Sequence, residues 1–405
     1  MNLEKIKSAP STREIDITNM NIPYHRPILP SDIHDVFPKS IQSGWLTTGP
    51  QVEKYENALK AYLGSDHVVA VNSCTGALHL ALAAKGFGPG EKFIVPTNTF
   101  VASAAVGEWL GMEPILIDCD PNSHNFDLNR VEKALTQNAN IKAIVPVHVA
   151  GEPVDMKVIF EWAEKYNLFV IEDAAHALEA ESTAGKIGNT NHAAAFSFYA
   201  NKNITTGGEG GALSTNDEQL AYDVKHLSIH GLSKDGWERY SAKNGWRYEI
   251  TQLGYKYNMT DISGAFGITQ LTHVDEWHKK RFQIIQKFKS GFDKINGLTL
   301  PSFNIHGKHG YHLYIVQFKE DLWRISRDEF IKKVNKSGIG TSVHYVPLHL
   351  HSYYQKTYGY TNGDFPVATA LSNRIISLPL YPDLKDEEVE YIIHTLNQLW
   401  TQYSL

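Results

Sequence analysis

Residues 68–82, VVAVNSCTGALHLAL, decide the fold of this 405-residue chain. The first four residues predict a short buried strand, and the run from residue 77 predicts a helix. The strand pattern recurs further along the chain, in residues 93–95, 114–117, 143–146 and 168–171. Short apolar strands that alternate with helices are typical of a mainly parallel sheet buried on both faces. We therefore expect an α/β fold for this part of the chain.

The pattern changes after a long helical stretch expected at residues 261–292. Beyond it we expect, in order, a strand at 311–318, a helix at 327–336, a strand at 340–345 and a terminal helix at 386–403. This mixture indicates a second, smaller α+β domain with its own core. Residues 217–246, before the long helix, should form a helix followed by a long loop. We expect the two domains at residues 1–280 and 281–405.

Composition excludes several classes of protein. The 38 basic and 44 acidic side chains give a net charge of −6, which argues against a nucleic-acid surface. Only two cysteines occur, so a disulfide framework is excluded and a reducing cytoplasm is the simpler compartment. Residues 1–13 lack the apolar core of a signal peptide, and no stretch approaches the ~18 apolar residues of a membrane span. The 19 histidines show no metal-ligand spacing, so we expect no metal, no membrane and a cytoplasmic protein.

Three segments that follow predicted strands carry candidate chemistry. Residues 73–77 begin a helix with small and hydroxyl side chains, which suits an anion but equally a simple helix cap. Residues 172–176, EDAAH, place Asp173 at a strand end, where it could pair with a cation or cap a helix. Residues 196–211 place one lysine, Lys202, between an aromatic strand and a glycine-rich run. A solvated lysine is the ordinary alternative, whereas a desolvated one becomes a nucleophile for a Schiff base.

Together the three segments match the needs of pyridoxal 5′-phosphate (PLP). This cofactor needs a cradle for its phosphate, an acid at its pyridinium nitrogen and a lysine for its imine. The carboxylate of Asp173 would keep the ring nitrogen protonated, so that the ring can accept the electron pair of a carbanion. Ligands of open α/β sheets lie at the carboxyl ends of the strands, where all three segments are expected. We therefore predict PLP as the cofactor, with pyridoxamine 5′-phosphate (PMP) as an intermediate.

The sequence also resembles a known family, the DegT-like or StrS-like sugar aminotransferases of PLP fold type I. The resemblance runs from about residue 24 to the C-terminus. It is carried, in order, by residues 43–50, 73–79, 96–100, 172–177, the Lys202 segment, 230–231 and 254–259. It implies a large PLP-binding domain that carries an N-terminal substrate-side segment, and a smaller α+β C-terminal domain. It also implies a homodimer with shared active sites.

The resemblance assigns roles to individual residues. Lys202 would form the Schiff base, and Asp173 would pair with the pyridinium nitrogen. The remaining contacts of the cofactor would be His176 at the ring hydroxyl, Phe100 stacked on the ring, and Thr75, Gly76 and Ser197 at the phosphate.

Two positions depart from the usual pattern of the family. Cys74 stands where relatives usually have glycine, a departure that a side chain as small as that of cysteine could make without displacing the phosphate loop. Lys256 stands where many relatives have an asparagine that reaches the phosphate of the neighbouring subunit; a cation would serve the same end, and a solvated surface lysine is the alternative. The substrate contacts would include Trp45, Thr48 and His344.

The function that the resemblance implies is amino transfer from glutamate to a nucleotide-linked 4-keto-6-deoxy sugar, for surface glycans or secondary metabolites. One alternative is transfer to C-3 of the sugar. A sugar 3-dehydratase is disfavoured, because that subgroup replaces the Schiff-base lysine with histidine and this chain keeps Lys202. A PLP-binding regulatory protein without turnover is the alternative from another class.

Overall fold

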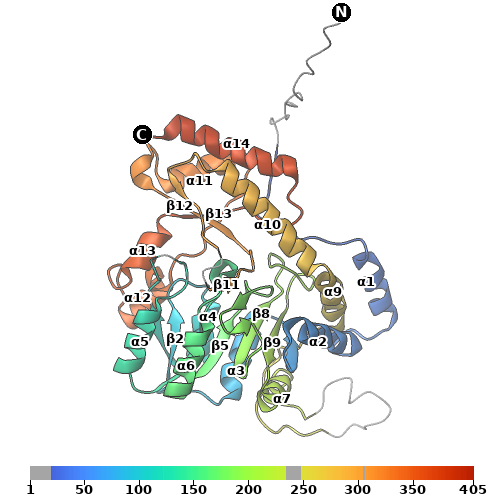
Figure 1. Ribbon diagram of the computed structural model, residues 1–405. Coiled ribbons are helices and arrows are strands. Elements are labelled where there is room, and N and C mark those ends of the chain that lie inside the picture. Colours follow the sequence, from blue (N-terminus) through green and yellow to red (C-terminus); the bar gives the residue numbers. More distant parts are fainter. Residues whose placement is uncertain (1–19, 122, 234–247, 304–305) are drawn as a thin grey trace, which may run out of the picture.

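A seven-stranded sheet forms the centre of the larger part of the molecule (Figure 1). The computed structural model describes residues 20–121, 123–233, 248–303 and 306–405. The strands of this sheet are, in chain order, β1 (His67–Val71), β2 (Lys92–Pro96), β3 (Glu113–Ile117), β4 (Ile141–Ile144), β5 (Phe169–Asp173), β8 (Ala193–Ser197) and β9 (Gly211–Thr215). Their order across the sheet is β1-β9-β8-β5-β4-β2-β3.

Six of these strands point in one direction. The pairs β2–β3, β2–β4, β4–β5 and β5–β8 are parallel, whereas β9 runs antiparallel to both of its neighbours, β1 and β8. The carboxyl ends of β1, β5 and β8 therefore meet at one edge, which is where ligands of open α/β sheets bind. The predicted mainly parallel α/β sheet is confirmed.

Helices cover both faces of the sheet. One face packs against α3 (Cys74–Ala84), α4 (Ala102–Trp109) and α7 (Glu218–Leu227). The other face packs against α2 (Pro50–Leu63), α5 (Leu128–Gln137), α6 (Met156–Tyr166) and α9 (Asp261–Thr272). Val69 and Val71 of β1 enter the first core and Val68 and Ala70 the second, because successive side chains of a strand point to opposite faces.

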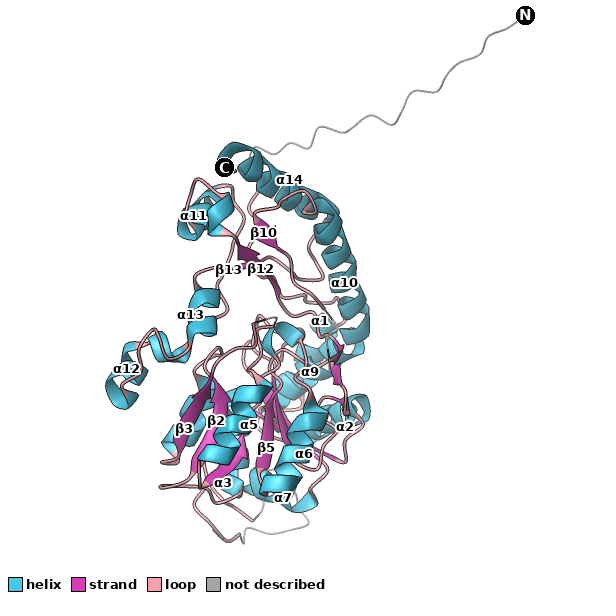
Figure 2. Ribbon diagram, turned by 60° about the vertical axis from the view of Figure 1, so that its left-hand side comes forward, coloured by secondary structure: helices cyan, strands magenta, loops and turns pink. Residues whose placement is uncertain are grey.

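A second, three-stranded sheet builds a smaller core above the first, as Figure 2 shows. Its strands are β10 (Leu298–Thr299), β12 (Tyr314–Phe318) and β13 (Ile375–Leu378), and its helices are α10 (Val274–Gly291), α11 (Arg327–Lys336) and α14 (Asp386–Tyr403). Helix α11 begins where the sequence predicts, because Ser326 and Glu329 form a reciprocal capping box. Ile22 of the N-terminal segment is buried in the same core.

The remaining elements include a further small sheet and several shorter helices. A small sheet joins β6 (Glu181–Ser182) and β7 (Gly185–Lys186) to β11 (Gly307–Lys308). The other helices are α1 (Ile33–Gln42), α12 (Ser352–Tyr358) and α13 (Pro366–Ser372). The division at residues 280 and 281 falls within α10, and it stays a prediction.

Two predicted elements differ from the structure. The helix expected at 261–292 is two helices, separated at His273, whose N–H donates to the Gln270 carbonyl (3.1 Å) in a tighter turn. No proline or glycine marks this break, so local sequence contains no signal for it. The strand expected at 340–345 makes only one bridge, between Ser342 and Ser377 of β13, and the chain then continues into the wall of the site.

Candidate active site

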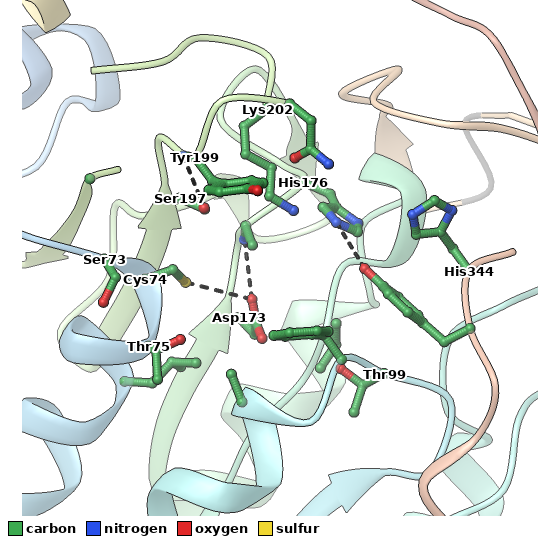
Figure 3. Close-up of a pocket in the computed structure, with 18 of the residues that line it drawn as sticks. Ser73, Cys74, Thr75, Thr99, Asp173, His176, Ser197, Tyr199, Lys202 and His344 are labelled. Carbon is green, nitrogen blue, oxygen red and sulfur yellow. Dashed lines mark hydrogen bonds between the residues drawn. The ribbon is translucent and has the colours of Figure 1, made fainter. Parts of the chain in front are cut away.

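A cavity of about 460 Å³ opens at the edge of the sheet where β1, β5 and β8 end (Figure 3). Its wall comes from the three segments singled out in the sequence, together with residues near 99–102 and 343–345. Eight of the predicted site residues line it: Cys74, Thr75, Phe100, Asp173, His176, Ser197, Lys202 and His344. The fold therefore brings together side chains that are up to 270 positions apart in the chain.

Lys202 lies in the loop after β8. The N–H of Lys202 donates to the Tyr199 carbonyl (2.9 Å), and the N–H of Ala200 donates to the Gly208 carbonyl (2.9 Å). Gly208 has a φ of 127°, a conformation that favours glycine. Burial lowers the pKa of Lys202 to about 8, while the nearby Asp173 carboxylate acts in the opposite direction. More of Lys202 is therefore neutral at pH 7 than of an exposed lysine, as Schiff-base formation requires.

Asp173 is the last residue of β5 and is buried. Its Oδ1 accepts the N–H of Ala175 (3.2 Å), and its Oδ2 accepts the hydroxyl of Ser103 (2.6 Å). Turns rather than a helix follow it in residues 174–180, so the alternative of a helix cap is wrong. The carboxylate lines the same cavity as Lys202, and it can pair there with the protonated nitrogen of a bound ring.

The N-terminus of α3 forms another part of the wall. Ser73 caps this helix, because its Oγ accepts the N–H of Gly76 (3.0 Å). The N–H group of Gly76 therefore already has an acceptor. The resemblance implies that Gly76 contacts the phosphate, whereas in the structure Gly76 does not line the cavity. The N–H groups of Cys74 and Thr75 precede the first helical hydrogen bond, so they have no acceptor within the helix. They can donate to an anion, which the helix dipole also favours.

The hydroxyl of Ser197 completes this polar wall. Ser197 ends β8, and its Oγ accepts the N–H of Tyr199 (3.4 Å). Its own proton remains available for a ligand. A helix N-terminus and two hydroxyl side chains, Thr75 and Ser197, therefore border the space where a phosphate would fit.

His176 contacts a residue that the sequence analysis did not assign. Its Nδ1 accepts the N–H of Ala150 (3.2 Å), so Nε2 carries the proton and donates to the hydroxyl of Tyr345 (3.1 Å; Figure 3). Burial lowers the pKa of His176 well below its usual value, which keeps the ring neutral. In this arrangement the Tyr345 hydroxyl can donate a hydrogen bond to a ligand.

Cys74 and Phe100 border the space between the two polar walls. The Sγ atom of Cys74 lies 3.4 Å from the Ala195 carbonyl and 3.8 Å from Asp173 Oδ1, so the loop accommodates its small side chain. Phe100 is 59% exposed and borders the cavity. A flat ring bound beside Asp173 would cover it.

Besides Gly76, three predicted site residues lie outside this cavity. Trp45 donates through Nε1 to the Thr48 carbonyl (2.9 Å), and the Thr48 hydroxyl donates to the Met259 carbonyl (2.7 Å). Asn258 donates to the Thr48 hydroxyl (2.7 Å), and Lys256 donates to the side-chain carbonyl of Asn258. Trp45, Thr48 and Lys256 therefore form a separate cluster within this chain.

Sequence reasoning missed several residues of the site. Tyr345 lies beside the predicted His344, and Ser103 lies one helical turn after Thr99. Ser103 follows the motif at residues 96–100, and Tyr345 ends the segment expected as a strand at 340–345, yet neither has a spacing that indicates a contact with Asp173 or His176. The cavity is also lined by Tyr199, Asn201 and Glu209.

Two further observations concern the described residues alone. Within them, no helix is both long and apolar enough to cross a membrane. Nor do they contain a group of three or more histidine, cysteine, aspartate or glutamate side chains that could hold a metal ion. The predicted loop at the end of residues 217–246 lies largely outside the described residues, which resume at 248.

These features define a class of protein. A lysine at the end of one strand, an acid at the end of the next and a helix N-terminus, all on one cavity of a mainly parallel sheet, fit the three functional groups of PLP. The chain is thus a PLP enzyme of fold type I.

Comparisons with known proteins give the family. Residues 28–397 match the DegT/DnrJ/EryC1/StrS aminotransferase family. The chain is 42% identical over 382 residues to the spore coat polysaccharide biosynthesis protein SpsC of Bacillus subtilis, covering 94% of this chain and 97% of SpsC. It is 31% identical to the UDP-4-amino-4-deoxy-L-arabinose–oxoglutarate aminotransferase of Shewanella sediminis, covering 95% and 99%.

A solved structure supports the same conclusion. The PMP form of Spr1654 from Streptococcus pneumoniae is similar to this chain with a TM-score of 0.86 and 31% identity, over 94% of this chain and 100% of that one. The same protein has also been solved in its PLP form. The present chain belongs to the DegT/DnrJ/EryC1/StrS family of sugar aminotransferases, and its cofactor is pyridoxal phosphate.

Proposed function

We propose that this enzyme transfers the amino group of glutamate to C-4 of a nucleotide-linked 4-keto-6-deoxy sugar. The observation that carries the proposal is the shared cavity of Lys202 and Asp173, which suits a transaminase rather than a PLP-binding protein without turnover. The match to a relative named for a 4-amino sugar nucleotide and for oxoglutarate supports the position and the donor. The match to a spore coat polysaccharide protein supports a product used in surface glycans.

Individual residues of the chain would have separate roles in this reaction. When bound, PLP takes up the amino group of the donor and passes it to the keto sugar. The Nζ atom of Lys202 would carry a proton to and from the reacting carbon, and its lowered pKa suits this exchange near neutral pH. Asp173 would hold its negative charge beside the ring nitrogen. The hydroxyls of Thr75 and Ser197 would hold the phosphate.

We also propose that the enzyme is a homodimer with shared active sites. A phosphate dianion needs cationic or N–H donors, and Lys202 is the single cation among the residues that line the cavity in the described part of the chain. Lys256 lies outside the cavity of its own chain, next to Thr48 through Asn258. Delivery of Lys256 and Thr48 to the cavity of a second copy would give both residues a function.

A panel of substrates tests the proposed function. The purified enzyme, loaded with PLP, is mixed with glutamate and UDP-, dTDP- or GDP-linked sugars that carry a keto group at C-4 or at C-3, and oxoglutarate is measured. We expect product from 4-keto sugars and none from the Lys202→Ala control. Product from 3-keto sugars alone would move the reaction to C-3. A cofactor spectrum that does not change on adding glutamate would favour the binding protein without turnover.

A further inference from the structure

Ser103 has a close contact with the proposed acid of the site. It lies in the first turn of α4, and its side chain is fully buried without lining the cavity. Its Oγ is 2.6 Å from Oδ2 of Asp173 and 2.7 Å from Oγ1 of Thr99. The two hydroxyls and the carboxylate therefore form one continuous chain.

The direction of the hydrogen bonds in this chain follows from the chemistry of its members. An ionised carboxylate can only accept, so the Ser103 hydroxyl donates its one proton to Asp173. The Oγ atom of Ser103 must then accept a hydrogen bond that the Thr99 hydroxyl donates. Bonds of this kind to a charged oxygen are short and strong, and successive bonds reinforce one another in a buried site.

The other carboxylate oxygen has its own partners. Oδ1 of Asp173 accepts the N–H of Ala175 (3.2 Å), and the Sγ atom of Cys74 lies 3.8 Å away. A thiol is a weak donor, so the strong bond from Ser103 and the backbone bond from Ala175 fix the plane of the carboxylate. A carboxylate that lines the cavity with its plane fixed is prepared for a ring N–H.

We propose that Ser103 is a positioning residue for Asp173, and that Thr99 orients Ser103. The hydrogen bond that the Ser103 hydroxyl donates stabilises the ionised carboxylate, which in turn keeps the ring nitrogen of the cofactor protonated. This inference rests on the proposed role of Asp173. Without Ser103, the carboxylate loses its strongest donor and can rotate away from the ring nitrogen.

The test uses the holoenzyme loaded with PLP that carries ¹⁵N in its ring. The ¹⁵N chemical shift reports protonation of the ring nitrogen directly and is independent of turnover. Ser103→Ala removes the hydroxyl with little change of shape, Thr99→Val removes the orienting donor, and Ser103→Thr retains a hydroxyl. Ser214→Ala is the matched control, since Ser214 is equally buried but donates to the Gly188 carbonyl (2.8 Å) away from the site.

The expected results differ between the variants. Ser103→Ala should move the ring ¹⁵N shift toward the unprotonated value and lower kcat by about tenfold or more, with KM for the sugar within about twofold. Thr99→Val should move the shift in the same direction by a smaller amount, and Ser103→Thr should restore it. Ser214→Ala should change the melting temperature alone.

Two outcomes would overturn the proposal. The first is a ring ¹⁵N chemical shift that is the same in Ser103→Ala, in Thr99→Val and in the unchanged enzyme. The second is a change of this chemical shift in Ser214→Ala that is as large as the change in Ser103→Ala. If Ser103→Ala does not fold, Thr99→Val decides. Asp173→Asn, measured in the same way, separates the two hypotheses: an unchanged shift there refutes the role of Asp173 itself, whereas a change there without one in Ser103→Ala refutes only this inference.

Discussion

The rate at which the apoprotein takes up PLP should depend on pH through Lys202. Only the neutral amine attacks an aldehyde. Burial lowers the pKa of Lys202 from 10.5 to about 8, so ~9% of it is neutral at pH 7, compared with ~0.03% of an exposed lysine. The rate should rise tenfold per pH unit below pH 8 and level off above it, because the neutral form is then fully populated.

The charge of Asp173 sets where this midpoint falls. A nearby carboxylate favours the protonated amine, so it raises the pKa of Lys202 against the effect of burial. Asp173→Asn should therefore move the midpoint to a lower pH. A midpoint that moves to a higher pH would contradict this account of the electrostatics.

The assay follows the visible absorbance of the bound cofactor by stopped flow after apoprotein is mixed with excess PLP at constant ionic strength. Lys202→Ala gives the background from surface lysines. A simple amine measured in parallel corrects for the titration of PLP itself. A corrected rate that still rises tenfold between pH 9 and pH 10 would refute the reasoning, because it would indicate a lysine with an ordinary pKa.

Four further changes test the site and the fold. Lys202→Ala should abolish transamination and the absorbance of the lysine-bound cofactor, since proton transfer alone typically contributes ~10²–10⁴-fold; turnover within tenfold of the unchanged enzyme would contradict the assignment. Asp173→Asn should retain PLP but transaminate poorly, and near-normal activity with a normal spectrum would place the acid elsewhere. Lys202→Ala chains mixed with Lys256→Ala chains should regain activity above either parent, because one site of each mixed dimer carries neither change. If Lys256→Ala alone is inactive and mixing rescues nothing despite confirmed subunit exchange, the sites are not shared. Arg281→Met should lower the free energy of unfolding of the apoprotein in urea by ~3–5 kcal/mol, because the buried carboxylate of Glu179 loses its charged partner and keeps the hydrogen bond from the Asn203 amide (2.6 Å); a loss below about 1 kcal/mol would contradict the role of this ion pair.

Local patterns in the sequence predicted most of the elements and their succession along the chain. The terminal helix at 386–403 and the helix at 327–336 have the predicted bounds, because caps and a 3.6-residue period are local properties. The alternation of strands and helices predicted a sheet with both faces covered. The order of the strands, with β9 reversed between β1 and β8, depends on pairing between distant segments, and no local pattern encodes it.

The candidate site likewise depends partly on local sequence and partly on tertiary contacts. The sequence alone predicted that Lys202 and Asp173 lie near each other, because each stands at or after the end of a predicted strand and the carboxyl ends of parallel strands meet at one edge. Tertiary structure decided which atoms touch. The Ser103 hydroxyl reaches Asp173 across 70 positions of the chain, and the Tyr345 hydroxyl reaches His176 across 169.

Tertiary structure also separated Thr48 and Trp45 from the cavity of their own chain, although the motifs gave no sign of this; for Lys256 the family resemblance already implied a contact with the neighbouring subunit. The physical reason is the range of the interactions. Strand and helix signals act over a few residues, whereas the contacts of a buried hydroxyl or a lysine depend on how distant elements pack.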